Sequence, residues 1–432
     1  MRVEVFKRII SEWQERPLPE VMPREIEVKP TKERITAIVG PRRAGKTYLM
    51  FYIIKNLVEK VGKEKIIFID FEDNRLVGLK NEELDEIFVA HRELTGKEPE
   101  YLFFDEIQNI KYWSKFIRRL HNLNKYSIVV SGSSSKLLTG EIATELRGRY
   151  RSVLILPFTF TEFLKAKGFS YTKMTAYTEK KGGILRHFNN YLSYGGFPEV
   201  VKAKTEEEMR ELARTYYDTI FYRDILERYK IKNKEIIEML MAYITDNNAS
   251  IFSISSFEKI MKERGVRISK KTVSQYLRYL EESFFVFSLE KFSYSPKTRM
   301  INPKKVYIVD NVFHTFLSTT LSPNKGKLLE ALVARELKRR GYNLGYFKEK
   351  NECDFIVSDG KKIVAAVQVT YEINERNKKR ELNGLAEALE KLKIKNGLVL
   401  TYDQKENLLF KNKRIKVLPV WEFLMFPKEN AF

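Results

Sequence analysis

The segment from Gly40 to Thr47 limits what this chain can fold into more than any other segment. It reads Gly-Pro-Arg-Arg-Ala-Gly-Lys-Thr and matches the pattern G-x-x-x-x-G-K-[ST]. An apolar run at 35–39 precedes it, and a helix-compatible segment begins at Tyr48. In this strand–loop–helix setting the backbone N–H groups of the loop surround an anion, and the positive end of the following helix points at the same place. The segment therefore predicts a phosphate-binding loop rather than an ordinary glycine turn.

The residue types in this loop indicate its ligands. We expect Lys46 to reach the terminal phosphates of a nucleotide and the Thr47 hydroxyl to ligate Mg²⁺. The predicted cofactors are therefore ATP and Mg²⁺. The residues expected to contact the nucleotide are Gly40, Pro41, Arg42, Arg43, Ala44, Gly45, Lys46, Thr47 and Tyr48.

The second part of the expected site follows an apolar strand at 101–104, which ends in Asp105 and Glu106. A carboxylate at the end of a strand beside a phosphate loop holds Mg²⁺, a role that suits Asp105. Glu106 is then placed to polarise the attacking water. The alternative is a strand that simply emerges into solvent, but two adjacent acids at a buried strand end are hard to explain structurally.

Two further features could complete catalysis. Residues 126–130 predict another buried strand, and Ser131 at its end is a candidate contact for the γ-phosphate or the water. A serine-rich turn that caps the next helix is the alternative. Downstream, Arg147 and Arg149 are candidates for an arginine supplied from a neighbouring subunit to stabilise charge on the transferred phosphoryl group. Pairing with surface carboxylates is the competing interpretation of both arginines.

Five short apolar strands are expected to start near Ile35, Ile66, Tyr101, Ser127 and Ser152, with helical patterns between most of them. Alternating strands and helices predict an α/β fold with a parallel sheet covered on both faces. We assign residues 1–156 to this nucleotide-binding core and residues 157–245 to a helical lid and connector.

Composition limits the partners and the cell compartment. The net charge of +21 favours a polyanionic partner such as DNA or a membrane surface, although a generic basic surface is the alternative. No apolar run reaches the roughly 18 residues of a transmembrane helix, and the first residues carry no signal-peptide pattern. A single cysteine excludes an internal disulfide and a multi-cysteine metal site. We therefore expect a cytoplasmic protein with no membrane partner.

The motifs together resemble the archaeal-type AAA ATPases of prokaryotes, in particular a family whose C-terminal half is a domain of unknown function. The resemblance covers nearly the whole chain. It implies ATP use, self-association into homo-oligomers and possible rings, and a C-terminal nuclease-like module. Besides the phosphate loop, the segments that carry it are 104–106, 131–134, 146–150, 156–164, 194–199 and 222–225.

Residues 246–302 predict a winged helix-turn-helix, with helices at 253–265 and 270–280 and a strand-like run at 284–287. The second helix would enter the major groove of DNA through its N-terminal face. A winged helix that only packs against protein is the alternative. The polar residues available for phosphates and bases are Lys270, Lys271, Ser274, Gln275 and Arg278.

Residues 303–432 resemble a PD-(D/E)XK nuclease fold, with Glu330 on a helix and Asp354 at the end of a strand. The family pattern implies an acid at 368 and a lysine at 370, but Gln368 and Thr370 stand there. Such hydrolysis depends on clustered carboxylates, Mg²⁺ and a lysine. The departure favours a DNA-binding remnant or a packing module over an active nuclease, unless Lys361 or Lys362 replaces the lysine.

The sequence as a whole predicts an ATP-hydrolysing, DNA-binding protein in which the nucleotide state changes the arrangement of subunits or the grip on DNA. Three alternatives stay open. They are an ATP-dependent nuclease, an ATPase that scaffolds proteins in signalling, and a nucleotide switch with negligible turnover.

Overall fold

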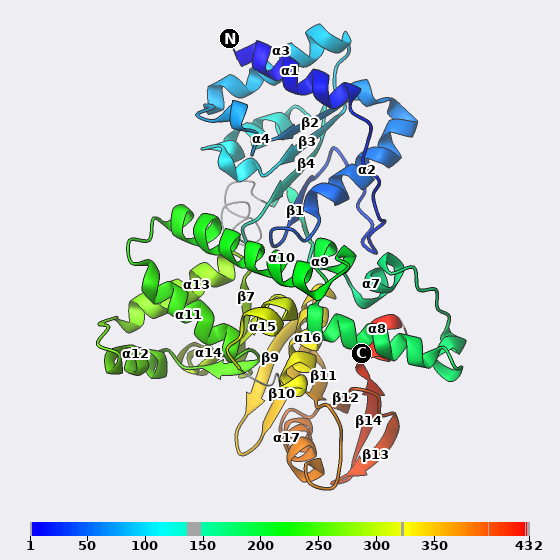
Figure 1. The fold of residues 1–432 in the computed structure, drawn as a ribbon, viewed down its shortest axis with the longest axis vertical. Helices are drawn as coiled ribbons and strands as arrows, with labels where there is room; N and C mark the ends of the chain where they lie inside the picture. The colour runs from blue at the N-terminus through cyan, green and yellow to red at the C-terminus, as the bar shows by residue number, and fades with distance from the viewer. Residues whose placement is uncertain (1, 136–147, 321–323, 396, 428, 430–432) are drawn as a thin grey trace. The chain divides into compact units, whose positions relative to one another are not determined.

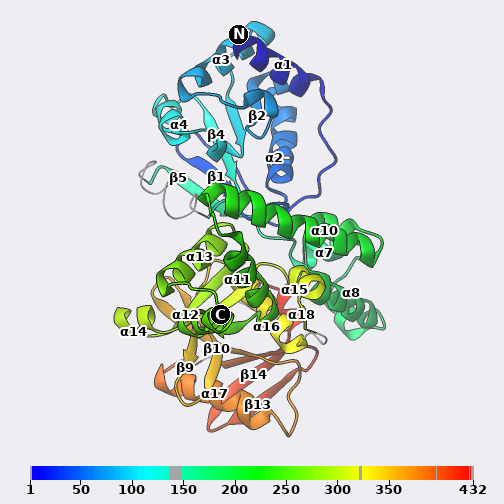
Figure 2. The same cartoon turned by 60° about the vertical axis from the view of Figure 1, so that its left-hand side comes forward.

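The structure is a computed structural model that describes residues 2–135, 148–320, 324–395, 397–427 and 429. The chain forms two compact units, Met1–Leu156 and Pro157–Phe432. Figure 1 shows the ribbon, and Figure 2 shows it after a turn of 60°. In the described part of the chain, no helix combines the length and apolarity that a bilayer crossing requires.

In its described residues, the first unit is built on a five-stranded parallel sheet of order β2-β3-β4-β1-β5. Helices α2 and α4 lie on opposite sides of this sheet (Figures 1 and 2). The predicted parallel α/β fold is therefore confirmed. The strands are β1 (Ile35–Val39), β2 (Ile66–Asp70), β3 (Tyr101–Asp105), β4 (Ser127–Gly132) and β5 (Tyr150–Leu154), and the helices are α1 (Arg2–Glu15), α2 (Lys46–Val61), α3 (Glu86–Thr95) and α4 (Trp113–Asn122).

The central strands of this sheet carry mainly apolar side chains on both faces, because helices cover both faces of the sheet. Strands β1 and β4 are buried at every position. Strand β4 lies between β1 and β3. The carboxyl ends of parallel strands meet at one edge, so Ser131 on β4 lies between the loop that follows β1 and the carboxylates that follow β3.

The second unit contains a nine-stranded mixed sheet in its described residues, of order β13-β14-β12-β11-β10-β9-β7-β8-β6. The strands are β6 (Ser250–Phe252), β7 (Val286–Lys291), β8 (Lys304–Ile308), β9 (Asn343–Lys348), β10 (Glu352–Asp359), β11 (Lys362–Val369), β12 (Gly397–Thr401), β13 (Glu406–Phe410) and β14 (Lys413–Pro419).

Helices dominate the first part of the second unit, as expected for 157–245. A π-helix, Ile220–Glu227, follows α10 directly. The α-helices of this unit are α7 (Phe160–Ala166), α8 (Lys181–Tyr194), α9 (Pro198–Lys202), α10 (Glu206–Thr219), α11 (Lys234–Asp246), α12 (Ile254–Glu263), α13 (Lys270–Glu282), α14 (Pro296–Ile301), α15 (Asn311–Leu317), α16 (Lys325–Arg339), α17 (Lys378–Lys391) and α18 (Val420–Met425).

The strand pairing changes two details of the sequence-based interpretation. Strand β8 pairs antiparallel with both β6 and β7, so the boundary expected between residues 302 and 303 falls inside one set of paired strands. The sheet also continues from β7 to β9 through parallel pairing. Asp354 lies near the start of β10 and not at a strand end, because the turn at 349–351 separates β9 from β10.

A buried ion pair explains why glycines stand in the Gly-Gly-Phe-Pro segment that follows α8. The N–H of Gly196 donates to Asp310 Oδ2 at 2.9 Å, and Arg335 forms an ion pair with the same carboxylate. Gly195 has a φ of 72°, and a Cβ on it would lie 1.5 Å from Asp310 Oδ1. Only glycine permits this backbone conformation and this approach.

Candidate nucleotide site

The phosphate loop leads into α2 through Gly45, whose φ of 95° lies in the left-handed region. Lys46 is the first residue of α2 and is only 5% exposed. Its ammonium group donates to the carbonyl oxygens of Gly40 at 3.2 Å and Pro41 at 3.1 Å. The lysine therefore turns back along the loop instead of extending into solvent.

Three elements meet at Asp105. The Thr47 hydroxyl of α2 donates to Asp105 Oδ2 at 2.6 Å, and the Ser131 hydroxyl of β4 donates to Asp105 Oδ1. Ser131 Oγ also accepts from the N–H of Glu106 at 3.1 Å. The carboxylate at the end of β3 is thus held between hydroxyl groups from the two elements expected to flank it.

Glu106 lies beside this group and is buried. Its Oε1 is 3.4 Å from the Lys46 ammonium, while Oε2 accepts from the N–H of Ser133 at 3.2 Å and from the Gln108 amide. These contacts fix the direction of the carboxylate. Its backbone φ of 48° is in the left-handed region, which redirects the chain directly after β3.

The two acids differ in their pKa values. Burial and the neighbouring charge of Glu106 raise the pKa of Asp105. Burial alone would raise the pKa of Glu106 as well, but the charges of Lys46 and Arg42 outweigh it, so this pKa is lowered. Glu106 is therefore a carboxylate at neutral pH, the form that can accept a proton.

The donor set fits a magnesium nucleotide. Hydroxyl and carboxylate oxygens are the ligands that Mg²⁺ prefers, and in such sites Mg²⁺ uses few protein ligands together with phosphate oxygens and water. Thr47 Oγ1 and Asp105 Oδ2 already lie side by side. Among the described residues, no three carboxylate, imidazole or thiol groups gather as a site that could hold a metal ion.

The other residues expected at the nucleotide differ in exposure, since Gly40, Pro41 and Ala44 are buried and Arg43 is exposed. Arg42 forms an ion pair with Glu72 at 2.7 Å, and Tyr48 is exposed. Arg149 lies just before β5, at the edge opposite the phosphate loop, and hydrogen bonds to Asn122. The structure therefore does not bring Arg149 to the loop of its own chain. Arg147 lies outside the described residues.

The five residues expected to contact nucleic acid share one face of α13. All five are exposed, while Val273, Leu277 and Leu280 on the other face are buried. They also line a groove of about 880 Å³ with the segment 300–304. The residues are Lys270, Lys271, Ser274, Gln275 and Arg278.

The structure also brings Glu330, Asp354 and Gln368 into one polar network. Lys361 and Lys362 do not reach it, because they lie at the far end of the β10–β11 hairpin, where Lys362 pairs with Asp359. The lysine at the centre of the network is Lys305 of β8.

Sequence reasoning missed Lys305 and also Gln108. Lys305 lies two residues before Tyr307 on β8, and side chains two residues apart point to the same face of a strand. This spacing was the available signal that Lys305 faces inward. Gln108 follows Glu106 by two residues in a turn, a position for which the sequence carries no pattern.

Comparisons with known proteins agree with this architecture. A family model described as an AAA domain matches residues 32–164. Models of two domains of unknown function, DUF8612 and DUF4143, match residues 185–321 and 325–423.

Curated relatives occur in archaea and bacteria. An uncharacterized protein of Methanocaldococcus jannaschii is 39% identical, over 93% of this chain and 91% of its own length. An uncharacterized protein of Haemophilus influenzae is 30% identical, over 79% of this chain and 83% of its own length.

Similar solved structures include the Walker-type ATPase PABY2304 of Pyrococcus abyssi, at 16% identity and a TM-score of 0.42, over 73% of this chain and 95% of that one. Another is the Aeropyrum pernix ORC1 protein in complex with DNA, at 13% identity and a TM-score of 0.30. This similarity covers 77% of this chain and 94% of that one.

The parallel sheet, the phosphate loop and the AAA match identify the first unit as an AAA-type P-loop ATPase domain. The second unit adds a mixed sheet and spans both domains of unknown function. The chain belongs to the family of AAA-domain proteins that includes these relatives from Methanocaldococcus jannaschii and Haemophilus influenzae.

Proposed function

We propose that this protein hydrolyses ATP at the Lys46–Asp105–Glu106 site, binds duplex DNA through α13, and couples its nucleotide state to DNA binding or to subunit arrangement. The observation that carries the ATPase part is the meeting of Thr47, Asp105 and Ser131 at one edge of the sheet.

Each residue has a distinct task in this proposal. Lys46 binds the terminal phosphates, and Thr47 with Asp105 would hold Mg²⁺, which supplies positive charge against the phosphate oxygens. Glu106 accepts a hydrogen bond from the attacking water, and Ser131 contacts the γ-phosphate or that water. A triphosphate competes with Glu106 for the Lys46 ammonium, which now lies 3.4 Å from the carboxylate. Nucleotide binding would therefore release Glu106 for the water.

Lys46→Ala is expected to abolish ATP binding, because the substitution removes the cation that faces the phosphates inside the loop. Isothermal titration calorimetry with ATP and Mg²⁺ measures this directly. Lys60→Ala is the matched control, since Lys60 lies in the last turn of the same helix and is exposed. Undiminished binding by folded Lys46→Ala protein would refute the assignment of the loop.

The DNA-binding part of the proposal is supported by the elements around α13. Helices α12 and α13 are joined by the short link 264–269, and the paired strands β7 and β8 follow, an order that fits a winged helix-turn-helix. The groove beside α13 carries Lys270, Lys271 and Lys304. Clustered cations with exposed polar side chains suit a phosphate backbone and base edges.

Exchange of Lys270 and Lys271 for alanine is expected to weaken binding to all duplex sequences alike. Each lost phosphate contact lowers the slope of log K against log salt by about 0.9. The matched control exchanges Lys378 and Lys379, an adjacent exposed pair at the start of α17. Fluorescence anisotropy across a salt series measures both. Equal losses of DNA affinity in the two double variants would show that DNA does not bind at α13. An absence of DNA binding by the wild type would favour an ATPase that scaffolds proteins.

Self-association is part of the same proposal. Arg149 lies at the amino end of β5, about 15 Å of strand away from the edge that carries the phosphate loop. An arginine in this position suits the nucleotide of a neighbouring subunit better than that of its own.

A further inference from the structure

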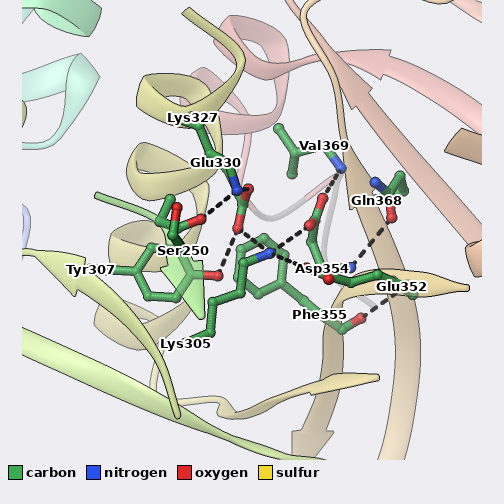
Figure 3. A network of polar contacts seen from close by, with 12 residues as sticks. Ser250, Lys305, Tyr307, Lys327, Glu330, Glu352, Asp354, Phe355, Gln368 and Val369 are labelled. Carbon is green, nitrogen blue, oxygen red and sulfur yellow. Dashed lines mark hydrogen bonds and ion pairs between the residues drawn. The ribbon is translucent and has the colours of Figure 1, made fainter. Parts of the chain in front are cut away.

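The ammonium group of Lys305 lies at the centre of three carboxylates in the second unit (Figure 3). Lys305 comes from β8 and is 1% exposed. Its Nζ is 2.7 Å from Glu330 Oε1 on α16 and, on β10, 2.9 Å from Glu352 Oε1 and 2.8 Å from Asp354 Oδ1. A lysine has three N–H donors, which equals the number of carboxylates around this ammonium group.

These distances are those of charge-assisted hydrogen bonds and not of metal coordination. An N⁺–H···O⁻ bond spans about 2.7–2.9 Å, whereas Mg²⁺ holds its oxygen ligands at about 2.0–2.1 Å. The spacing of Glu330, Glu352 and Asp354 therefore matches an ammonium ion.

The charges of the pocket are balanced without another cation. Lys327 lies 3.4 Å from Glu330 Oε2, and Lys348 lies 3.2 Å from Glu352 Oε2. With Lys305, three ammonium groups face three carboxylates. Burial alone would lower the pKa of Lys305, but the charges of Asp354 and Glu330 outweigh it and raise the pKa well above its ordinary value.

Further hydrogen bonds hold the carboxylates in place. Tyr307 OH donates to Glu330 Oε1 at 2.8 Å, and the N–H of Val369 donates to Asp354 Oδ2 at 2.9 Å. Gln368 Oε1 accepts from the N–H of Asp354, and its amide donates to Glu381. Gln368 thus forms a hydrogen bond with the backbone of β10 and adds no charge to the pocket.

We propose that Lys305 is the resident cation of this pocket, occupying the place that a divalent metal would need, so that the second unit binds no such metal there and does not cleave DNA. Lys305 thereby also joins β8 to α16 and β10. The inference is independent of ATP hydrolysis and of DNA binding by α13. Removal of the ammonium group should expose a divalent-cation site, since three carboxylates surround its place and Glu352 is partly exposed.

Mn²⁺ is the probe, used with full-length protein that carries Asp105→Asn and no nucleotide, so that the first unit contributes no Mn²⁺ site. Electron paramagnetic resonance measures free and bound Mn²⁺. We expect no binding at the pocket with Lys305 present and bound Mn²⁺ after Lys305→Met. Adding Glu330→Gln to Lys305→Met should remove that binding.

Lys348→Met is the matched control, because it deletes the same charge beside Glu352 while the central ammonium stays, and it should gain no Mn²⁺ site. Mn²⁺ should also raise the melting temperature of Lys305→Met and not that of Lys348→Met, since a ligand stabilises the state that binds it.

Three results would overturn the proposal. One is Mn²⁺ binding by protein with Lys305 present that Glu330→Gln abolishes. The second is folded Lys305→Met protein that binds no Mn²⁺. The third is Mn²⁺-dependent cleavage of supercoiled DNA by the wild type that Glu330→Gln abolishes. The first and third need only Glu330→Gln, so they decide the question even if Lys305→Met does not fold.

Discussion

Glu106→Gln is expected to bind ATP as the wild type does and to hydrolyse it about 10²- to 10⁴-fold more slowly, the usual range for loss of a general base. The amide keeps the shape of the side chain and its place beside Gln108 and Ser133. It cannot take a proton from water. Binding should survive because the contact with Lys46 is not needed to hold phosphate.

The steady-state rate of phosphate release and the affinity for ATP are measured on the same preparations. Glu72→Gln is the matched control, since it removes the same charge from a partly exposed partner of Arg42. Its turnover should stay close to that of the wild type. Wild-type turnover by Glu106→Gln would show that another group activates the water.

Arg335→Met is expected to lower the free energy of unfolding of the second unit by about 3 to 5 kcal/mol, because it leaves the buried carboxylate of Asp310 without its cation. Arg335 is also within 3.1 Å of the Tyr191 hydroxyl, which itself donates to the carbonyl of Phe158 at 2.6 Å. Loss of the guanidinium therefore disturbs the packing of α8 against α16 as well.

Urea denaturation followed by circular dichroism measures this effect. Arg278→Met is the matched control in the same unit, because Arg278 is exposed and its ion pair with Glu282 should contribute less than about 1 kcal/mol. Adding Asp310→Asn to Arg335→Met should recover part of the loss, since no buried charge then stays unpaired. Equal stability of Arg335→Met and Arg278→Met would contradict the assigned role of this ion pair.

The nucleotide-binding fold was predictable because its signals are local. The loop pattern, the apolar strands and the acids after β3 each occupy a few consecutive residues. The rules for connections between parallel strands then leave only a few possible strand orders for such a sheet. The beginning of β5 at Tyr150 instead of Ser152 is a small difference, typical of element boundaries.

The second unit was less predictable because its key contacts join residues far apart in the chain. The helices expected at 253–265 and 270–280 are found as α12 and α13, whereas the strand expected at 284–287 begins only at Val286, after a turn at 283–285. The pairing of β8 with β6 and β7, which crosses the expected boundary at 302, depends on long-range packing. The same is true of the cation that accompanies Glu330 and Asp354, which is Lys305 and neither Lys361 nor Lys362, the two substitutes that the sequence offered.

The class of ligand and the type of fold of the first unit follow from the amino-acid sequence, because a phosphate loop and its strand are encoded in contiguous residues. Which charged groups meet is set by the folded chain. Lys305 reaches Asp354 across 49 positions of sequence, and Arg335 reaches Asp310 across 25. Buried charges are stable only with a partner, and the chain path through the sheet selects that partner.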